Sequence, residues 1–251
     1  MKQVYLCPVT ESHPVGDYHL IRVLAPALAA LANPGQFLHI RCGSQSLRRP
    51  ISIFDVREDI VSFIFEVKGT GTAFLSRVRE GDELDIIGPL GSGFPSFDGP
   101  VLVAGGGIGI PPLYFTARML PEADAVLGFR SADKALLTEE FSEVCRETLI
   151  MSDDGTLGRQ GFVAQGVAEM LSRNAYQAVL ACGPKIMLKT TFEAASAAGI
   201  PCYVSMEERM GCGIGACLVC AVPLIRDGRQ VMGHVCKDGP VFPGEEVDWN
   251  A

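Results

Sequence analysis

Met210 to Cys236 read MGCGIGACLVCAVPLIRDGRQVMGHVC, and this stretch contains four of the nine cysteines of the chain. The first three, Cys212, Cys217 and Cys220, follow the spacing C-x4-C-x2-C. This order, with one more cysteine further on, is the ligand order of a plant-type [2Fe–2S] cluster bound by four thiolates. Glycines lie between the cysteines, so the backbone can wrap closely around an inorganic core and direct N–H groups at its sulfur atoms. The stretch therefore predicts a cluster bound by these three cysteines and Cys236.

Zinc is the competing metal for four cysteines. All-cysteine zinc sites usually present two C-x2-C-like pairs, whereas this stretch has one such pair and a C-x4-C that shares Cys217. A site without metal would leave the cysteines as small buried hydrophobes, which poorly explains four of them in a short glycine-rich run. The spacing favours the iron–sulfur cluster over zinc. Because the last spacing is shorter than in plant-type ferredoxins, we expect a compact variant.

Length and composition exclude several classes of protein. The 251 residues, 48% of them hydrophobic, are enough for two domains and a small module. The net charge is −8 and no basic block occurs, which argues against nucleic acid as a partner. No apolar run predicts a signal peptide or a membrane span. An odd number of cysteines without a leader indicates reduced thiols, and hence a cytoplasmic protein.

Residues 1–97 have the pattern of short strands separated by turns, which predicts a small antiparallel barrel. The candidate strands are 37–42, 61–67 and 82–88, with a short helix at 72–78. Alternation in the second strand places on one face Val61, Phe63, Phe65 and Val67.

Two segments of this part could bind phosphate. The sequence RRPIS, residues 48–52, combines guanidinium groups, which bind phosphate bidentately, with a proline-fixed turn and a hydroxyl. The sequence KGTGT, residues 68–72, offers free backbone N–H groups before a short helix. The first could also be an ordinary basic surface turn, and Thr70 or Thr72 could be a plain N-cap. Together the two segments suggest the arms of a pyrophosphate site.

Residues 98–205 alternate between strands and helices, which predicts a parallel sheet with covering helices. Five strands are expected, at 101–104, 125–130, 148–152, 178–182 and 201–205. Ligands bind at the carboxyl ends of such strands, where three segments are expected to face one cleft: Gly105–Gly109, Asp153–Thr156 and Cys182–Pro184. The glycine loop lacks the full G-x-G-x-x-G pattern and could be a structural turn, and Cys182 could be a buried thiol.

The order of these motifs is specific when they are taken together. RPIS, GTGT, GGGIGIPP, SDDGT, CGP and the four-cysteine stretch follow one another along nearly the whole chain. In this order the chain resembles the ferredoxin–NADP reductase-like superfamily, and within it the electron-transfer subunits of class 1B dihydroorotate dehydrogenases. The resemblance implies an antiparallel FAD-binding barrel in 1–97, a five-stranded parallel NAD-binding sheet in 98–205 and a small [2Fe–2S] module in 206–251.

The resemblance also assigns roles to individual residues. It implies that FAD is bound by Arg49, Pro50, Ile51, Ser52, Glu66, Val67, Lys68, Gly71 and Thr72. It implies that the nicotinamide nucleotide is bound by Gly105, Gly106, Gly107, Gly109, Cys182, Gly183 and Pro184, and the cluster by the four cysteines. Two departures are clear. Ile51 stands where many members have a tyrosine, and the aromatic C-terminus that covers the flavin in plant-type reductases is absent, a role that we do not assign to Trp249.

The implied function is electron transfer. NAD(H) exchanges two electrons as a hydride, a [2Fe–2S] cluster passes one at a time, and FAD does both. By resemblance, electrons pass from the FMN of a dihydroorotate dehydrogenase catalytic subunit through the cluster and FAD to NAD+, in de novo pyrimidine (UMP) biosynthesis. The family assembles two subunits of each kind. Hydride transfer needs no general base, so no catalytic side chain is predicted.

Alternatives remain at this point. The chain could serve another oxidoreductase, such as a sulfide dehydrogenase, a glutamate synthase-like enzyme or a hydrogenase. It could also be a zinc-stabilised binding module without enzymatic activity. The preference for NAD over NADP comes from the family alone, since Arg130 could accept a 2′-phosphate.

Overall fold

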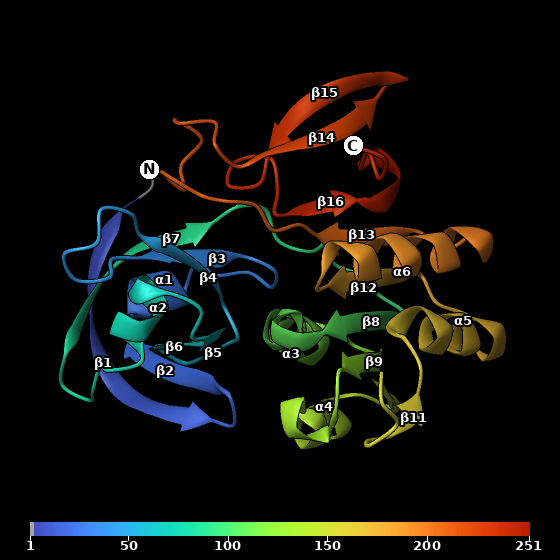
Figure 1. Cartoon of the computed structure of the whole chain (residues 1–251), viewed down its shortest axis with the longest axis horizontal. Helices are drawn as coiled ribbons and strands as arrows, with labels where there is room; N and C mark the ends of the chain where they lie inside the picture. The colour runs from blue at the N-terminus through green and yellow to red at the C-terminus, as the bar shows by residue number, and fades with distance from the viewer. Residues whose placement is uncertain (1–2) are drawn as a thin grey trace.

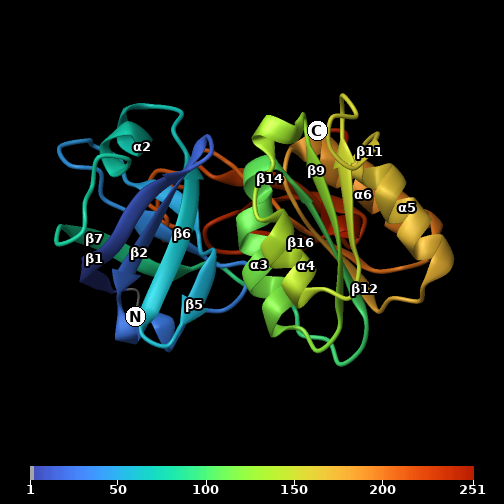
Figure 2. The same cartoon turned by 90° about the horizontal axis from the view of Figure 1, so that it is seen from below.

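The computed structural model describes residues 3–251. Figure 1 shows three parts: a barrel built from the N-terminal strands, an α/β domain beside it, and a hairpin module that lies above both. Seen from below, helix α3 (Ile110–Met119) lies between the barrel and the sheet of the α/β domain (Figure 2). No helix in residues 3–251 has the length and apolar character needed to cross a membrane.

The barrel is one antiparallel sheet of seven strands in the order β4-β3-β7-β1-β2-β6-β5. Its strands are β1 (Val4–Val15), β2 (Tyr18–Leu24), β3 (Phe37–Ile40), β4 (Arg49–Ser52), β5 (Asp55–Arg57), β6 (Ile60–Glu66) and β7 (Glu83–Leu90), with a short helix α1 (Pro26–Ala29). The edge strands β4 and β5 are joined through Ile53 and Phe54. The N–H of Ile53 donates to Gln36 and that of Phe54 donates to Ser62, so the sheet curls back on itself. The antiparallel barrel predicted from the sequence is confirmed.

Strand β6 differs from its prediction in one respect. Val61, Phe63 and Phe65 point into the barrel and are buried as expected, but Val67 follows the strand and is 45% exposed. The opposite face is buried as well, because Ile64 packs against the α/β domain. The short helix also shifts: α2 spans Thr70–Leu75, so it begins two residues before the predicted segment and ends three residues before its end.

The α/β domain contains a seven-stranded sheet in the order β11-β10-β9-β8-β12-β13-β16. Its strands are β8 (Val101–Gly106), β9 (Ala123–Phe129), β10 (Thr148–Ser152), β11 (Arg159–Gln160), β12 (Ala178–Cys182), β13 (Cys202–Ser205) and β16 (Val241–Pro243). The five predicted strands are its parallel core. The sequence prediction lacked β11, which is only two residues long, and β16, which pairs antiparallel to β13 from the far end of the chain.

Helices cover both faces of this sheet because successive residues of a strand point to opposite sides. Val101 and Val103 of β8 pack with α3 and α4, whereas Leu102 and Ala104 pack with α5 and α6. The helices are α4 (Thr138–Val144), α5 (Val163–Arg173) and α6 (Lys185–Ala197), with short 3-10 turns at Gly107–Gly109, Ala132–Lys134 and Gly244–Glu246. With both faces buried, the sheet forms a rigid support for the loops at its carboxyl edge.

A buried carboxylate links the barrel to α3. Asp55 is 4% exposed and accepts hydrogen bonds from Arg118 Nε and Nη2 of α3 at 2.9 and 2.7 Å. Arg57 donates to the same carboxylate and to the hydroxyl of Tyr114. The Tyr114 ring stacks on Phe54 at 5.1 Å between ring centroids. These contacts fix how the barrel sits against the α/β domain, and therefore the shape of the space between them.

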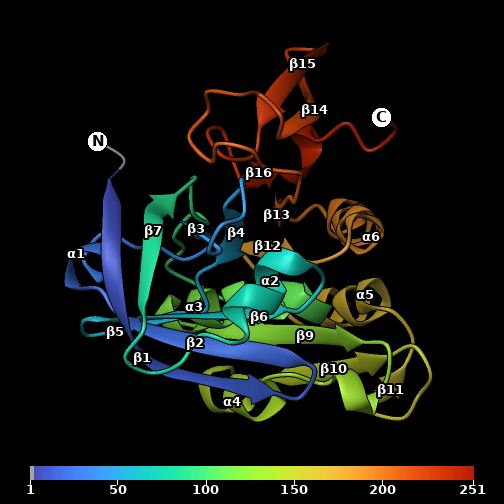
Figure 3. The same ribbon diagram turned by 60° about the vertical axis from the view of Figure 1, so that its left-hand side comes forward.

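The third part is a hairpin with a long preceding loop. Strands β14 (Ala221–Arg226) and β15 (Arg229–His234) pair around an Asp227-Gly228 turn in which both residues have positive φ. Asp-Gly is a strong hairpin signal. Figure 3 shows the hairpin above the other two parts. The boundaries 1–97, 98–205 and 206–251 stay predictions, because β16 returns from the hairpin module to the sheet of the α/β domain.

Asp124, which is 2% exposed, is expected to contribute strongly to stability. Its carboxylate accepts hydrogen bonds from Arg146, from Tyr176 at 2.7 Å and from the backbone N–H of Glu147. Burial alone would raise the pKa of Asp124, but the bonds from Arg146 and Tyr176 outweigh it and lower the pKa. We expect Asp124→Asn to reduce the free energy of unfolding by about 2 kcal/mol at pH 7.

The pH dependence of this loss has a definite sign. A carboxyl group whose pKa is lowered on folding contributes stability above its unfolded pKa, about 4, and loses that contribution as the pH falls through its folded value. Denaturant unfolding of Asp124→Asn and of the unsubstituted chain should therefore differ at pH 7 and converge below about pH 4. Glu139→Gln, at an exposed position, is the control. Equal unfolding midpoints at pH 7 would contradict the assignment.

Candidate functional site: two cofactor sites with a shared wall

The four predicted cluster ligands lie together at the base of the hairpin. Backbone N–H groups of the loop point at their sulfur atoms. Cys212 Sγ accepts from Ile214, Ala216 and Cys217 at 3.2–3.4 Å. Cys236 Sγ accepts from Gly215 at 3.1 Å. This is the arrangement expected from the small residues between the cysteines, because each N–H donor stabilises sulfur as thiolate.

The acidity of the thiols follows these contacts. Burial raises the pKa of Cys212, but the N–H groups of Ile214, Cys217 and Ala216 outweigh it and lower the pKa to about 6. Burial, together with the neighbouring Cys220, raises the pKa of Cys236 to about 12.

The cysteines are arranged as two pairs. Cys212 and Cys217 exchange backbone N–H to sulfur contacts at 3.4 Å. The Cys236 N–H donates to Cys220 Sγ at 3.4 Å. In residues 3–251, no three side chains of the His, Cys, Asp or Glu types converge closely enough to hold a single metal ion. Two pairs of thiols match a cluster in which two thiolates bind each of two irons, so the residues present fit a [2Fe–2S] cluster.

A cavity of about 230 Å³ lies next to this loop, between the barrel and the α/β domain. Its wall combines predicted flavin residues with residues that border the cluster loop. From the barrel it is lined by Phe37, Pro50, Ile51, Ser52, Ile64, Phe65, Glu66, Lys68 and Thr72. From the rest of the chain it is lined by Ile108, Ser205, Met206, Glu207, Glu208, Met210, Val235 and Pro240. Val67 comes directly after the last residue of β6 and its side chain is exposed, so it does not line the cavity.

The two adjacent arginines have different surroundings. Arg48 donates to the side chain and carbonyl of Asp85 at 2.8 and 2.9 Å, so it holds strands together. Arg49 makes hydrogen bonds only to the carbonyls of Leu47 and Arg48, and within residues 3–251 it has no carboxylate partner. Its guanidinium lies over Gly71, where a Cβ would be 2.5 Å from Arg49 Nε. RPIS and GTGT are thus brought together, and Arg49 keeps its charge available for a phosphate.

The start of α2 explains Thr72. Gly69 is the N-cap, so neither threonine has that role. The Thr72 hydroxyl instead accepts from the backbone N–H groups of Lys68 and Gly69 at 2.9 and 3.2 Å. The side chain therefore holds the turn that leads from β6 into the helix, and it also lines the cavity.

The glycine loop and the Cys182–Pro184 segment touch each other at the carboxyl edge of the sheet. A Cβ on Gly109 would lie 2.5 Å from the carbonyl carbon and oxygen of Cys182, so only glycine permits this approach. A Cβ on Gly106 would meet Met187 Sδ at 2.6 Å. Gly107, between these two glycines, has φ +53° and nothing within 4 Å of a Cβ built on it, so the loop opens to free space at that residue. Cys182 itself is 2% exposed, and burial raises the pKa of its thiol to about 12.

The third predicted segment of that cleft lies elsewhere. Strand β10, which precedes Asp153–Thr156, is separated from β8 by β9. Asp154 accepts from Thr156, whose hydroxyl accepts from the N–H of Ala132. The Asp154 N–H donates to the carbonyl of Arg130. The segment therefore joins Arg130 at the corner after β9, two strands away from the glycine loop.

Comparison with known proteins agrees with this geometry. Residues 207–248 match the family model described as the iron–sulfur cluster binding domain of dihydroorotate dehydrogenase B. The electron transfer subunit of dihydroorotate dehydrogenase B (NAD(+)) from Caldanaerobacter subterraneus subsp. tengcongensis is 41% identical over 86% of this chain and 87% of its own length. That of Bacillus pumilus is 37% identical over 98% of both chains. The chain belongs to the family of dihydroorotate dehydrogenase B electron transfer subunits.

Solved structures agree with the fold of this family. A chain of an NADH-dependent reduced ferredoxin–NADP oxidoreductase superimposes with a TM-score of 0.88 and 31% identity, covering all of this chain and 92% of that one. The ferredoxin reductase of carbazole 1,9a-dioxygenase superimposes at 0.62 with 19% identity, over 79% of this chain and 67% of that one. The second likeness shows the fold alone. The prediction of a ferredoxin–NADP reductase-like protein is confirmed.

In this family member, the structure adds residues that the sequence did not suggest. Glu207, Glu208 and Met210 line the cavity from the segment between β13 and the cluster loop. Glu207 is exposed to solvent by its accessible area, yet the protein atoms around it raise its pKa and the charge of Lys68 partly offsets this. His39 lies under the cluster loop and is 1% exposed. No motif surrounds these residues, so only the packing of distant segments could identify them.

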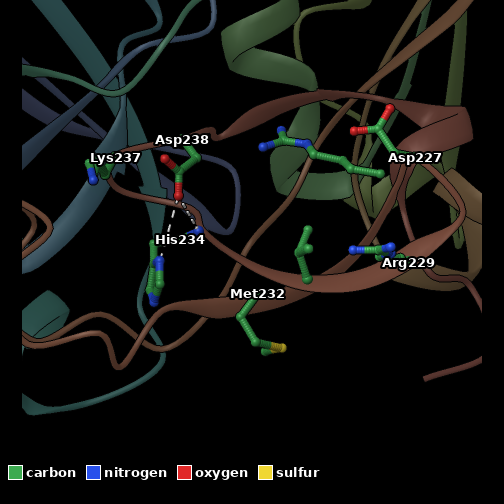
Figure 4. Close-up of a pocket in the computed structure, with 8 residues that line it drawn as sticks. Asp227, Arg229, Met232, His234, Lys237 and Asp238 are labelled. Carbon is green, nitrogen blue, oxygen red and sulfur yellow. Dashed lines mark hydrogen bonds and ion pairs between the residues drawn. The ribbon is translucent and has the colours of Figure 1, made fainter.

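The electron transfer subunit also has an open groove along the hairpin. It is lined by Arg226, Asp227, Arg229, Val231, Met232, His234, Lys237 and Asp238. Asp238 accepts from the N–H of His234 and lies 3.5 Å from its imidazole (Figure 4). Arg226 pairs with Glu246 at 2.6 Å. The groove carries charges of both signs that are partly paired within the chain, so it does not suggest a small charged ligand.

Proposed function

We propose that this chain transfers electrons between NAD(H) and a dihydroorotate dehydrogenase catalytic subunit, through FAD and a [2Fe–2S] cluster. One observation carries the proposal. The cavity lined by Pro50, Ile51 and Ser52 is also lined by Met210 and Val235, which lie within two residues of cluster cysteines in the sequence. The flavin site and the cluster site therefore share a wall.

The chemistry of hydride and single-electron exchange belongs to the flavin and the cluster when they are bound. The chain binds and orients them. We propose that Arg49, whose guanidinium lies over Gly71, holds the flavin phosphates, as the resemblance implies. A Cβ on Gly107 would meet nothing within 4 Å, and we propose that this open side of the glycine loop receives the nicotinamide end of NAD(H). No general base is needed, and we assign none.

The corner at Arg130 contains two acidic residues. Asp133 lies three residues further along the chain, and Asp154 donates its N–H to the Arg130 carbonyl. Their carboxylates are engaged with Thr156, Ser131 and Lys134, so the choice of NAD in this proposal comes from the NAD(+)-linked relatives.

The proposed partner is the FMN-containing catalytic subunit, in a heterotetramer with two subunits of each kind in the cytoplasm. A surface for it exists at the cluster. Cys217 is exposed, and the apolar side chains of Ile214, Leu218 and Val219 next to it are 45%, 57% and 55% exposed. Exposed apolar side chains gathered in one loop are typical of protein interfaces. We infer that this edge faces the catalytic subunit.

Leu218→Glu tests this surface. A carboxylate buried in an apolar interface loses hydration without gaining a partner. We expect dihydroorotate-dependent NAD+ reduction by the reconstituted complex to fall by about tenfold or more. NADH oxidation with ferricyanide should stay within about twofold of the unsubstituted protein, since the cavity is not touched.

Phe162→Glu is the matched control. Phe162 is 66% exposed and precedes α5 on the side of the sheet away from the barrel. The control should leave both activities unchanged. If Leu218→Glu keeps full dihydroorotate-dependent NAD+ reduction when the concentration of the catalytic subunit is limiting, the partner does not dock at this edge.

A second function has a specific observation in its favour. The likeness to the chain of NADH-dependent reduced ferredoxin–NADP oxidoreductase is at 31% identity over the whole of this chain, so a different catalytic partner must be considered. An activity assay on the purified chain mixed with a dihydroorotate dehydrogenase catalytic subunit distinguishes the two functions. Dihydroorotate-dependent NADH formation supports the first function, and its absence with intact flavin and cluster favours the second.

The cofactor content is tested first, on anaerobically purified protein. The proposal expects about one FAD, two irons and two sulfides per chain, with visible absorption that NADH bleaches. Zinc without sulfide or flavin would overturn the proposal and leave a structural module.

A further inference from the structure

Strand β3 presents two faces with different neighbours. Leu38 and Ile40 point into the barrel and are fully buried there. Phe37 and His39 alternate with them, so they lie on the outer face. Phe37 packs with the core shared by the α/β domain and the hairpin module. His39 is therefore a polar side chain on a face that the cluster module covers.

The imidazole of His39 contacts the cluster loop directly. Gly213 is buried and has φ +70°, and a Cβ there would lie 2.6 Å from His39 Nδ1, closer than to Cγ at 3.0 Å or Cε1 at 3.2 Å. Gly213 directly follows the cluster ligand Cys212. The ring thus occupies the space that any larger residue at Gly213 would need.

Neither ring nitrogen makes a hydrogen bond of full geometry in residues 3–251, although the residue is 1% exposed and the backbone of Cys212 lies close enough to the ring to act on the pKa of His39. A neutral imidazole has one N–H donor and one acceptor, and leaving both unpaired in the interior costs free energy. Such an orphan polar group, aimed at a cofactor-binding loop, indicates that the occupied site supplies a partner.

The other side of His39 adjoins the flavin site. In the β3–β4 ladder His39 is paired with Pro50, which lines the cavity. Arg48 donates to the His39 carbonyl at 3.3 Å and to Asp85, which ties this part of β3 to its neighbours. One residue of the barrel therefore touches the cluster loop and is paired with the strand of the flavin motif.

We infer that His39 is a positioning residue: its Nδ1 side anchors the Cys212–Gly213 end of the cluster loop against the barrel, next to the flavin strand. The inference rests on the proposed function, because it assumes a cluster in this loop. It adds a role for a residue outside the cluster module. Through His39, a residue of the barrel would help to determine the position of the cluster and its surroundings.

Three substitutions at His39 test the role. Asn places a carboxamide close to the position of Nδ1, Gln places it close to Nε2, and Leu has the size of Asn without polar atoms. We expect His39→Leu to lose its cluster to a chelator at least about fivefold faster than the unsubstituted protein, since one polar contact at about 1 kcal/mol corresponds to that factor. The electron paramagnetic resonance spectrum and midpoint potential of its reduced cluster should shift as well. His39→Asn should restore all three properties to near the original values, and His39→Gln should not.

The outcomes separate the inference from the proposed function. Iron and sulfide in the unsubstituted protein test the function, and their absence would overturn it before any variant is compared. If the unsubstituted protein holds its cluster and His39→Leu matches it in chelator resistance, spectrum and potential, the role of His39 is wrong. It is also wrong if Asn behaves like Leu, because ring volume would then matter and not the polar contact. FAD content shows that each variant is folded, and if Leu does not fold, the difference between Asn and Gln decides.

Discussion

Cys220→Ser is expected to yield a protein that binds FAD, oxidises NADH with ferricyanide and fails to pass electrons to a catalytic subunit. Cys220 is 1% exposed and faces Cys236 at the buried end of the cluster site. A serine hydroxyl is a poor replacement for a thiolate that binds iron. We expect dihydroorotate-dependent NAD+ reduction to fall by more than about 100-fold, beyond the 10–100-fold typical of changes to the partners of a metal ligand.

The flavin reaction should survive because Arg49 and Gly71, the proposed phosphate arms, belong to the barrel and not to the cluster module. Cys145→Ser makes the same chemical change at another buried thiol, at the end of α4 in the α/β domain. That control should keep iron, sulfide and both activities. Full coupled activity in Cys220→Ser would show that electrons reach the partner without the cluster, and would overturn the proposed path.

Arg49→Ala is expected to weaken FAD binding by about 100-fold, with the fold retained. Charge-assisted hydrogen bonds to phosphate contribute about 1.5–3 kcal/mol, which corresponds to a factor of 10 to 150. The guanidinium lies over Gly71 and has no carboxylate partner in residues 3–251, so its removal leaves no buried charge of the chain unpaired. Equilibrium binding of FAD to the flavin-free chain measures the effect.

Arg41→Ala is the control for lost positive charge. Arg41 follows β3, is 61% exposed in its side chain and approaches Asp85 only to 3.9 Å. Its removal should change FAD affinity by less than about twofold, because exposed charge pairs contribute little. Equal affinities of Arg49→Ala and Arg41→Ala would show that the arginine of the RPIS sequence does not bind the flavin phosphates.

Local spacing determined much of this protein from the sequence. The C-x4-C-x2-C pattern predicted the ligand loop, because three of the four cysteines and the glycines between the first two lie within one short segment. The alternation of apolar strands with helices predicted the five parallel strands, since burial of both faces leaves a continuous apolar run in each strand. The turn before α2 and the proline-started α3 were likewise signalled by glycine and proline, whose backbone preferences act within a few residues.

What only the tertiary structure decided depends on segments that are distant in the chain. Val67 continues an alternating pattern, yet it is exposed because β6 ends at Glu66. Ile64, on the opposite face, is buried because the α/β domain packs against the barrel. Strand β16 is three residues long and owes its place to β13, about 40 residues earlier in the sequence. Short strands carry too little periodicity to be found without their partners.

The cofactor sites divide in the same way. The sequence suggested both arginines of RRPIS as phosphate ligands. The structure distinguishes them, because Arg48 is hydrogen-bonded to Asp85 whereas the guanidinium of Arg49 lies over Gly71. His39 has no motif around it, and its role follows from the cluster loop folding over β3. Residue types and their spacing can therefore predict a binding site whose residues are close together in the sequence. Where two distant segments meet, burial and contact decide the role, and these exist only once the chain has folded.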